Sequence, residues 1–307
     1  MQVSDRLVTR DSAPLDFLSN KSLIIVAANG VVTLSYTGRA FLDAVPTDQW
    51  LAEVVRGKRF DRSRKPPAIS FEQTLQVPDI GRNLERIRIA IQEIRLSAAI
   101  PTASIGKWYG ELFEIGFVGW QWYRKKRLRP IVGSIEKAAW SLSATIRYLP
   151  RSPLQCRRIG FTAVPAGHVT RAELTSLYSQ LGRLSEVDTE SALVTQIRQI
   201  SATTPIVGPD CMSVVMPRPG RAPIRVKYFP VHQSAADLVG VKWRARLPVA
   251  FSPWILAPAA CHAPSMVNGN TSSCFGGIEI SMSGPPSDIQ VLSSQARPVD
   301  PTLPPAR

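Results

Sequence analysis

Cysteine and histidine are scarce in this chain, which has four Cys and three His among 307 residues. The cysteines form no Cys-x-x-Cys pair; they are Cys156, Cys211, Cys261 and Cys274. Four such residues are too few for a disulfide framework, and no spacing brings two thiolates and two imidazoles around a zinc ion. We therefore expect no metal and no cofactor.

Long apolar runs are also missing. The two longest uncharged stretches, 22–38 and 247–278, are interrupted by Asn29-Gly30 and by many Pro, Gly, Ser and Asn residues, so neither predicts a membrane-spanning helix. The N-terminal segment MQVSDRLVTRD lacks the apolar core of a secretory signal. The sequence thus predicts no membrane partner, and its free thiols favour the cytoplasm.

Acidic residues are outnumbered: 23 Asp and Glu stand against 37 Lys and Arg, which gives a net charge of +14. Such a charge suits polyanions without requiring them. Hydrophobic residues make up 44% and charged residues 20%, a mixture typical of globular proteins that excludes wholesale disorder and coiled coils.

Runs of β-branched residues alternate along the chain with segments of helical periodicity. Residues 22–28 and 31–36 flank Asn29-Gly30 and predict a hairpin with a type I′ turn. Further strands are expected at 112–123, 141–148, 211–216 and 224–229, and helices within 41–55 and at 84–94, 170–184 and 189–200. Separate blocks of strands and helices favour an α+β fold in which helices cover antiparallel sheets.

Proline is concentrated toward the C-terminus, where the last 107 residues hold 16 of the 26 prolines. We interpret 1–230 as the folded body, 231–290 as a Pro-rich extension and 291–307 as a disordered tail. Within the extension, 249–257 and 274–283 are expected to dock as edge strands, where proline is tolerated.

The segments SDRLVT at 4–9 and SNKSLIIVAANGVVTLSYTG at 19–38 resemble the N-terminal half of a proteasome subunit, an N-terminal nucleophile (Ntn) hydrolase. In that family an Asp ends the second strand, a Lys opens the third and a Gly ends the fourth. Asp5, Lys21 and Gly38 match these positions, and 16 residues separate the first two, as in the family. Weaker similarity at 110–122 and 189–216 extends the match over roughly residues 1–230.

The resemblance implies a four-layer αββα sandwich of two antiparallel sheets and a peptide- or amide-bond hydrolase. In such enzymes the lysine lowers the proton affinity of an N-terminal Thr, Ser or Cys, the aspartate holds the lysine, and the glycine N–H binds the oxyanion. We accordingly expect Asp5, Lys21 and Gly38 to converge, with a homo-oligomer as the assembled form.

The family's nucleophile lies 16 residues before the aspartate, a position that this sequence does not contain. The chain as written is therefore expected to be inactive, and a non-catalytic role in assembly, like that of the proteasome's α-type subunits, stays open. Residues 1–9 should form a strand whose outer neighbour is another subunit or the 274–283 segment.

Two other readings are less favoured. A Cys–His pair could be drawn from His168, His232 and Cys261-His262, but nothing near them indicates an orienting acid. Basic clusters at 56–65 and 124–129, the second beside Trp120, Trp122 and Tyr123, could bind nucleic acid. However, aromatic residues that alternate in a strand usually face a core, so nucleic acid is not the expected partner.

Overall fold

The computed structural model shows a mixed α+β protein built on two large sheets. The structure describes residues 1–10, 13–16, 19–42, 45–57, 59–60, 69–70, 79–96, 112–123, 127–139, 141–148, 179, 185–219, 221–222, 224–229, 231, 250–251, 253–257, 260–262, 266–267, 272–275 and 278–282. The chain divides into two compact units, and each large sheet belongs to one of them. The first unit comprises 1–22, 152–253 and 262–307, and the second comprises 23–151 and 254–261.

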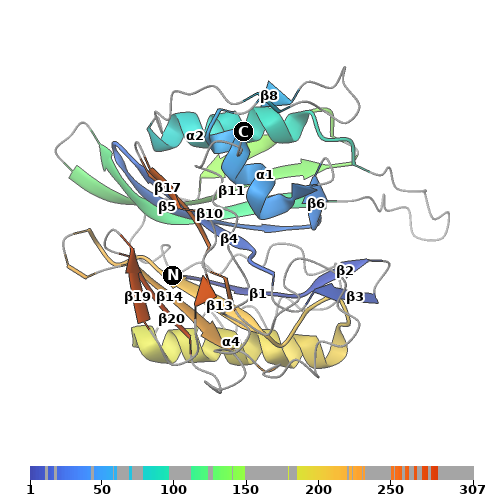
Figure 1. Ribbon diagram of the computed structural model, residues 1–307, viewed down its shortest axis with the longest axis vertical. Coiled ribbons are helices and arrows are strands. Elements are labelled where there is room, and N and C mark those ends of the chain that lie inside the picture. Colours follow the sequence, from blue (N-terminus) through green and yellow to red (C-terminus); the bar gives the residue numbers. More distant parts are fainter. Residues whose placement is uncertain are drawn as a thin grey trace, which may run out of the picture. The chain divides into compact units, whose positions relative to one another are not determined.

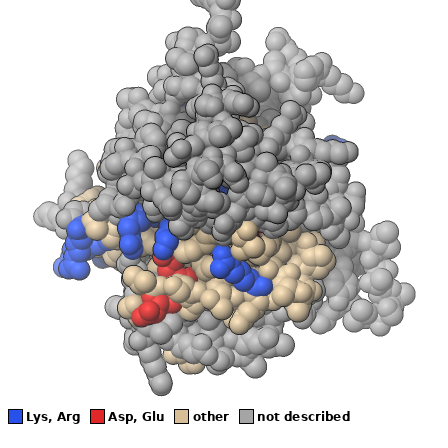
Figure 2. All heavy atoms as spheres, turned by 60° about the horizontal axis from the view of Figure 1, so that its bottom comes forward, with Lys and Arg blue, Asp and Glu red and all other residues tan. Residues whose placement is uncertain are grey.

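The first unit contains a five-stranded sheet with one long helix packed on it (Figure 1). The strands, in spatial order, are β1 (Gln2–Asp5), β13 (Cys211–Val215), β14 (Ile224–Phe229), β20 (Ile278–Met282) and β19 (Ser272–Phe275). Helix α4 (Glu186–Thr203) contacts β1 and β13. Figure 2, which brings the α4 side forward, shows that basic side chains outweigh acidic ones on the described part of this surface.

Strand β1 is an edge strand: it pairs with β13 on one side, and no described strand pairs with its other side. The expectation that 274–283 covers this edge is wrong, because β20 pairs in parallel with β14 and lies on the far side of β13. Strand β14 has its own free edge beyond the β13–β14 hairpin, and that edge is where the C-terminal strand adds.

The second unit contains a seven-stranded sheet and two helices (Figure 1). The strands, in spatial order, are β12 (Thr145–Tyr148), β11 (Arg127–Ala138), β10 (Leu112–Tyr123), β5 (Gly30–Thr37), β4 (Ser22–Ala27), β16 (Trp254–Ala257) and β17 (Ala260–His262). Helix α1 (Thr47–Val55) packs against α2 (Ile80–Gln92), and α2 contacts β5, β11 and β12. Docking of the 249–257 segment is thus observed, although β16 lies one strand inside the edge.

Short two-residue or irregular strands complete the described structure. They are β2 (Val8–Arg10) with β3 (Ala13–Asp16), β6 (Phe41–Leu42) with β7 (Val45–Pro46), β8 (Arg59–Phe60) with β9 (Ile69–Ser70), and β15 (Ala250–Phe251) with β18 (Met266–Val267). The 41–55 segment therefore begins as a small hairpin and becomes helical only at Thr47. Apart from Ser179, the helix expected at 170–184 lies outside the described residues, and so does the tail at 291–307.

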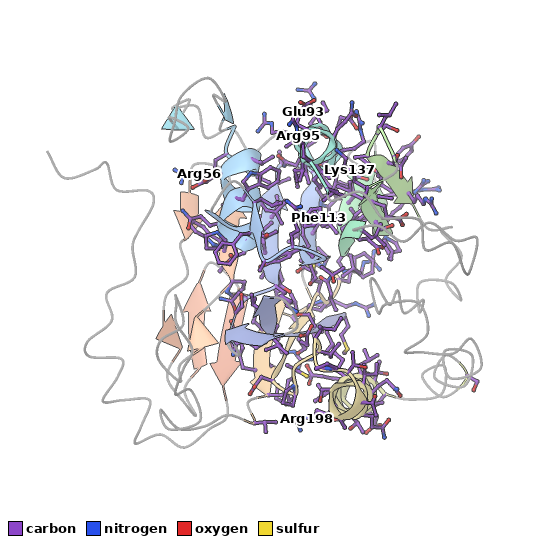
Figure 3. All side chains as sticks on the ribbon, turned by 90° about the vertical axis from the view of Figure 1, so that its right-hand side faces the viewer. Arg56, Glu93, Arg95, Phe113, Lys137 and Arg198 are labelled. Carbon is purple, nitrogen blue, oxygen red and sulfur yellow. The ribbon has the colours of Figure 1, made fainter. Side chains whose placement is uncertain are left out.

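Helices α2 and α4 begin after residues whose side chains accept a hydrogen bond from the first turn, whereas α1 follows Pro46, which provides no such cap. The Asp79 carboxylate accepts a hydrogen bond from Arg82 N at the start of α2, and Ser185 Oγ accepts one from Asp188 N at the start of α4. At the other end of α2, the Lys137 ammonium donates to the carbonyls of Gln92 and Ile94. Figure 3 shows Lys137 of β11 beside this helix end. In the described part of the chain, no helix is long and apolar enough to cross a membrane.

The hairpin between β4 and β5 differs in one detail from the predicted type I′ turn. Ala28 and Asn29 form the turn, and Gly30 is already the first residue of β5, with φ +152°. A Cβ at Gly30 would lie 2.1 Å from the Trp120 carbonyl oxygen, so the glycine permits the close approach of β10. The Asn29 side chain instead accepts a hydrogen bond from Ile80 N at 2.8 Å, which ties the turn to α2.

Two carboxylates face each other across β10 and β11, because the register places Glu114 directly opposite Glu136. Glu114 is only 9% exposed. Burial, and secondarily the Glu136 charge, raises the pKa of Glu114 to about 7. Glu136 accepts a hydrogen bond from Ser134 Oγ at 2.6 Å and lies 3.5 Å from Arg147.

We predict that this pair makes folding stability depend on pH near neutrality. Because the pKa of Glu114 is higher in the folded than in the unfolded chain, its contribution is complete below the ordinary glutamate pKa and is lost as pH rises through about 7. Glu114→Gln should flatten the fall in unfolding free energy between about pH 5 and 8, and at pH 8 it should stabilise the protein by about 1–3 kcal/mol. Urea denaturation at each pH measures this, and Glu93→Gln, at the exposed residue that directly follows α2, is the control. Equal slopes for the parent and Glu114→Gln would contradict the assignment.

Candidate functional site

The candidate site is centred on an ion pair between Asp5 and Lys21. Asp5 is the last residue of β1, and Lys21 directly precedes β4. Lys21 Nζ lies 2.8 Å from Asp5 Oδ1 and 2.9 Å from Oδ2, so the ammonium bridges both carboxylate oxygens. The Asp5 side chain is 18% exposed and the Lys21 side chain is 15% exposed. The contact that the 16-residue spacing predicts is therefore present.

The Asp5 carboxylate also accepts hydrogen bonds from the backbone. Its Oδ2 accepts from Leu7 N at 3.2 Å and from Gly208 N at 3.2 Å. Three segments of the chain thus converge on one side chain: the end of β1, the approach to β4 and the loop before β13. A carboxylate held by several donors has little freedom to rotate, so the position of the Lys21 ammonium is fixed as well.

Gly208 is required at this site for a steric reason. A Cβ at this position would lie 2.5 Å from Leu7 Cβ, a distance that real side chains do not tolerate. The glycine therefore lets the loop approach β1 closely enough for its N–H to reach Asp5. The sequence marks Gly208 as a break between a helix and a strand, but nothing in the sequence indicates a hydrogen bond across 203 residues.

The segment before Lys21 is anchored by a buried arginine and a buried tyrosine. Arg6 is 1% exposed, and its backbone carbonyl accepts from Ser19 N at 3.1 Å while its Nε donates to the Ser19 carbonyl. The Arg6 guanidinium lies 4.8 Å from the centroid of the Tyr228 ring. Tyr228 in turn donates its hydroxyl hydrogen to Asn20 Oδ1 at 3.3 Å, and burial raises the pKa of this phenol.

Cys211 stands directly opposite Asp5 in the register of β1 and β13, but it has the properties of a structural thiol. Its side chain is fully buried, and Sγ donates to the Pro209 carbonyl at 3.4 Å. Burial, and secondarily the Asp5 charge, raises the pKa of this thiol to about 12. Cys211 is therefore protonated at neutral pH and is not a nucleophile.

Hydroxyl groups near the ion pair are equally inaccessible. Ser19 is 2% exposed and Ser22 is 1% exposed, and these residues flank Lys21 in the sequence. Ser4 points to the other face of β1 from Asp5, because side chains alternate along a strand. Within the described residues, the ion pair thus has no accessible Ser, Thr or Cys nucleophile next to it in sequence or register.

Gly38, the third predicted site residue, belongs to the second unit and immediately follows β5. Its φ is +101°, and a Cβ would lie 2.1 Å from the Leu112 carbonyl oxygen, so both conformation and space require glycine. The residue is exposed, as an oxyanion-binding N–H would have to be. Its convergence with Asp5 and Lys21 stays a prediction.

The competing Cys–His reading gains nothing from the structure. His168 and His232 lie outside the described residues, and for Cys261 and His262 only the backbone, in β17, is described. Among the residues that the structure does describe, no group of three or more His, Cys, Asp or Glu side chains is placed to hold a metal ion.

Comparison of the chain with models of known protein families, with curated proteins and with solved structures finds no match in any of the three. The geometry around Asp5 and Lys21 and the order of the elements that hold them are therefore the features from which a function can be inferred.

We predict that Asp5 contributes more to stability than its partner Lys21. Asp5→Ala leaves the Leu7 and Gly208 N–H groups and the ammonium without their acceptor, which should cost about 2–4 kcal/mol of unfolding free energy. Lys21→Met removes one donor and should cost about 1–2 kcal/mol. Urea denaturation of the parent, both single variants and the double variant measures the coupling. Strictly additive costs would mean that the ion pair adds nothing beyond its separate parts.

Proposed function

We propose that this chain has an Ntn-hydrolase-like fold and that Asp5 and Lys21 are the charged pair of an amide-hydrolysing site. The observation that carries the proposal is the 2.8 Å contact between Lys21 Nζ and Asp5 Oδ1, at the end of one strand and the start of another. We further propose that the fold is the four-layer αββα sandwich that the resemblance implies, and that the protein acts in the cytoplasm.

The order of elements supports the proposal. After the aspartate-bearing strand come a lysine-led hairpin, two helices, a second long hairpin, a late helix, a glycine and a core strand. These are β1, β4–β5, α1–α2, β10–β11, α4, Gly208 and β13. The resemblance of the sequence to proteasome subunits implies this succession. The order of elements supports the proposed fold. It does not by itself support an activity, because many folds share parts of this order, so the activity is inferred from the residues of the site.

The arrangement suits one step of amide hydrolysis in particular. A terminal Thr, Ser or Cys beside Lys21 would attack the amide carbonyl carbon, and its own proton would pass to its free α-amine. The fixed ammonium would favour the deprotonated form of the nucleophile, and the Gly38 N–H would donate to the carbonyl oxygen as it becomes negative. Transfer of the proton to the leaving nitrogen breaks the C–N bond, and water then hydrolyses the acyl intermediate.

The first test supplies the nucleophile. An N-terminal extension places Thr 16 residues before Asp5, the interval that also separates Asp5 from Lys21, and removal of the initiator Met exposes the Thr amine. We expect this protein to hydrolyse fluorogenic peptide amides and to form a covalent adduct with a peptide vinyl sulfone, visible as an increase in intact mass. Lys21→Ala in the extended chain should lower the rate by about 100-fold or more.

The matched control carries Ala in place of the added Thr and should be inactive. The chain as written should show no turnover either. Steady hydrolysis by the unextended chain that survives mutation of both Asp5 and Lys21 would refute the mechanism. A folded, extended Thr variant that neither turns over nor reacts with the vinyl sulfone would refute the hydrolase assignment.

A second candidate function is a non-catalytic role in assembly, favoured by the open edge of β1 and the inaccessible nucleophiles around Asp5. Arg6 N donates to the Asp210 carbonyl at 2.9 Å, so the alternation of an antiparallel pair turns the N–H groups of Val3 and Asp5 away from β13. A second copy of the chain could pair with these groups.

If assembly uses this edge, sedimentation velocity should show a homo-oligomer that Val3→Pro dissociates. Proline removes an outward N–H and leaves the ladder to β13 intact, and edge strands tolerate it. Val3→Ala, which keeps the N–H, is the matched control and should leave the oligomer unchanged. A monomer at all concentrations, or an oligomer insensitive to Val3→Pro, would count against this role for β1.

A further inference from the structure

Strands β10 and β12, which both pair with β11, carry the three exposed large aromatic side chains of the described residues. Trp122 is 44%, Tyr123 40% and Tyr148 55% exposed. The expectation that the aromatic residues beside the basic 124–129 cluster face a core therefore fails for Trp122 and Tyr123, the two nearest to it. Exposed aromatics of this size usually have a partner.

The end of this hairpin extends beyond the pairing of its neighbouring strands. β10 pairs with β5 only as far as Gln121, and β12 pairs with β11 only over 133–136. Residues 122–123 and 127–128 thus form a short two-stranded end, within the green strands of Figure 1, where Trp122 N still donates to the Asn29 carbonyl. Trp122, Tyr123 and Arg127 are exposed at this end of the hairpin.

The two faces of the hairpin differ chemically. The register places Tyr123 opposite Arg127 and Gln121 opposite Arg129, so these side chains share one face, and Tyr148 lies on the same face opposite Gly133. The other face carries Trp122 opposite Leu128 and has no charged side chain at these positions. We call Tyr123, Arg127, Arg129 and Tyr148 the basic tyrosine surface.

The basic tyrosine surface combines positive charge with planar groups that can stack. The Arg129 guanidinium lies 4.3 Å from the centroid of the Tyr123 ring, which leaves a flat arginine–tyrosine pair at the surface. Tyr148 is held edge-on by Phe117, with 5.5 Å between ring centroids. Between Glu114 and Glu136 the sequence contains five Lys and Arg residues and no acidic residue, so no carboxylate of the hairpin competes for the arginines.

We propose that the basic tyrosine surface binds single-stranded nucleic acid. Phosphates would contact Arg127 and Arg129, and bases would stack on the Tyr123–Arg129 pair and on Tyr148. Tyr148, opposite Gly133, lies about 20 Å along β11 from Arg127 at about 3.4 Å per residue. The buried Ile131 lies between them on the same face, so Tyr148 would be a second stacking point, separate from Tyr123 and the two arginines. This inference is independent of the hydrolase proposal.

A single strand is favoured over an anionic membrane for a reason of order along the hairpin. The outermost described pair of the hairpin is Tyr123 with Arg127, so a charged side chain stands level with the outermost ring. The three residues between them in the sequence, Arg124, Lys125 and Lys126, are all basic. Insertion into a bilayer needs the aromatic side chains to lead, because the rings must reach the acyl boundary. A polynucleotide that lies across the strands meets charges and rings together.

Fluorescence anisotropy with labelled oligo(dT), at several salt concentrations, tests the proposal on the full chain. Arg127→Ala/Arg129→Ala should weaken binding about 10-fold or more and reduce the slope of log Kd against log salt by about 1. Tyr123→Ala should weaken binding about 10-fold while leaving the slope unchanged, and Tyr123→Trp should restore it. Circular dichroism melts confirm that each variant folds.

Two controls separate this surface from general charge and general exposure. Arg218→Ala/Arg221→Ala removes the same charge from two exposed positions of the first unit and should leave affinity within about two-fold. Trp122→Ala removes the neighbouring exposed aromatic from the opposite face and should do the same.

The proposal is wrong if the arginine control weakens binding as much as the hairpin pair does, because binding would then follow net charge alone. It is also wrong if Trp122→Ala, and not Tyr123→Ala, abolishes binding, since the ligand would then use the other face. Absence of oligo(dT) binding at physiological salt would overturn the proposal, because the surface would then not be a polyanion site. Tighter binding to vesicles containing phosphatidylserine than to oligo(dT) would overturn it in favour of a membrane site. A clear preference for duplex over oligo(dT) would reject stacking as the basis of recognition.

Discussion

The Asp5 carboxylate is the point at which the first unit of this protein is held together. It joins the ammonium of Lys21 and the N–H groups of Leu7 and Gly208, which come from three separate parts of the chain. Arg6 and Tyr228 then fix the backbone that leads to Lys21. Because a buried donor without an acceptor costs more than a hydrogen bond gains, the loss of this one side chain would disturb all three segments. The same rigidity is what a catalytic lysine needs.

Much of the fold could be predicted because the periodicity of apolar residues and the turn residues that end helices and strands are local features of the sequence. The β-branched runs around Asn29, the apolar stripe of Leu84, Ile87 and Ile91, and the strands at 211–216 and 224–229 appear where the sequence places them. The Asp5–Lys21 contact could be predicted for a different reason, because the resemblance to proteasome subunits supplied the 16-residue spacing. The turn lies at Ala28–Asn29, one residue before the predicted Asn29-Gly30. Gly30 belongs to β5, where it allows the close approach of the Trp120 carbonyl, and this contact between distant residues cannot be predicted from the local sequence.

What the sequence could not provide is pairing between distant segments. Gly208 gives no sign that its N–H meets Asp5, and Ile278–Met282 gives no sign that it joins β14 and not β1. An edge accepts any strand that can reach it, so several pairings satisfy the same pattern of residues. The opposed carboxylates of Glu114 and Glu136 are hidden for the same reason, because only the register brings them together.

The pairing of β1 with β13 also has a consequence for synthesis of the chain. The aspartate of β1 leaves the ribosome 203 residues before the glycine that it binds, an interval of roughly 10–40 s at ordinary elongation rates. During that time β1 is made and its partner strand is not. Folding of the first unit during synthesis cannot therefore be completed around β1, and the second unit has the opportunity to order most of its sheet first.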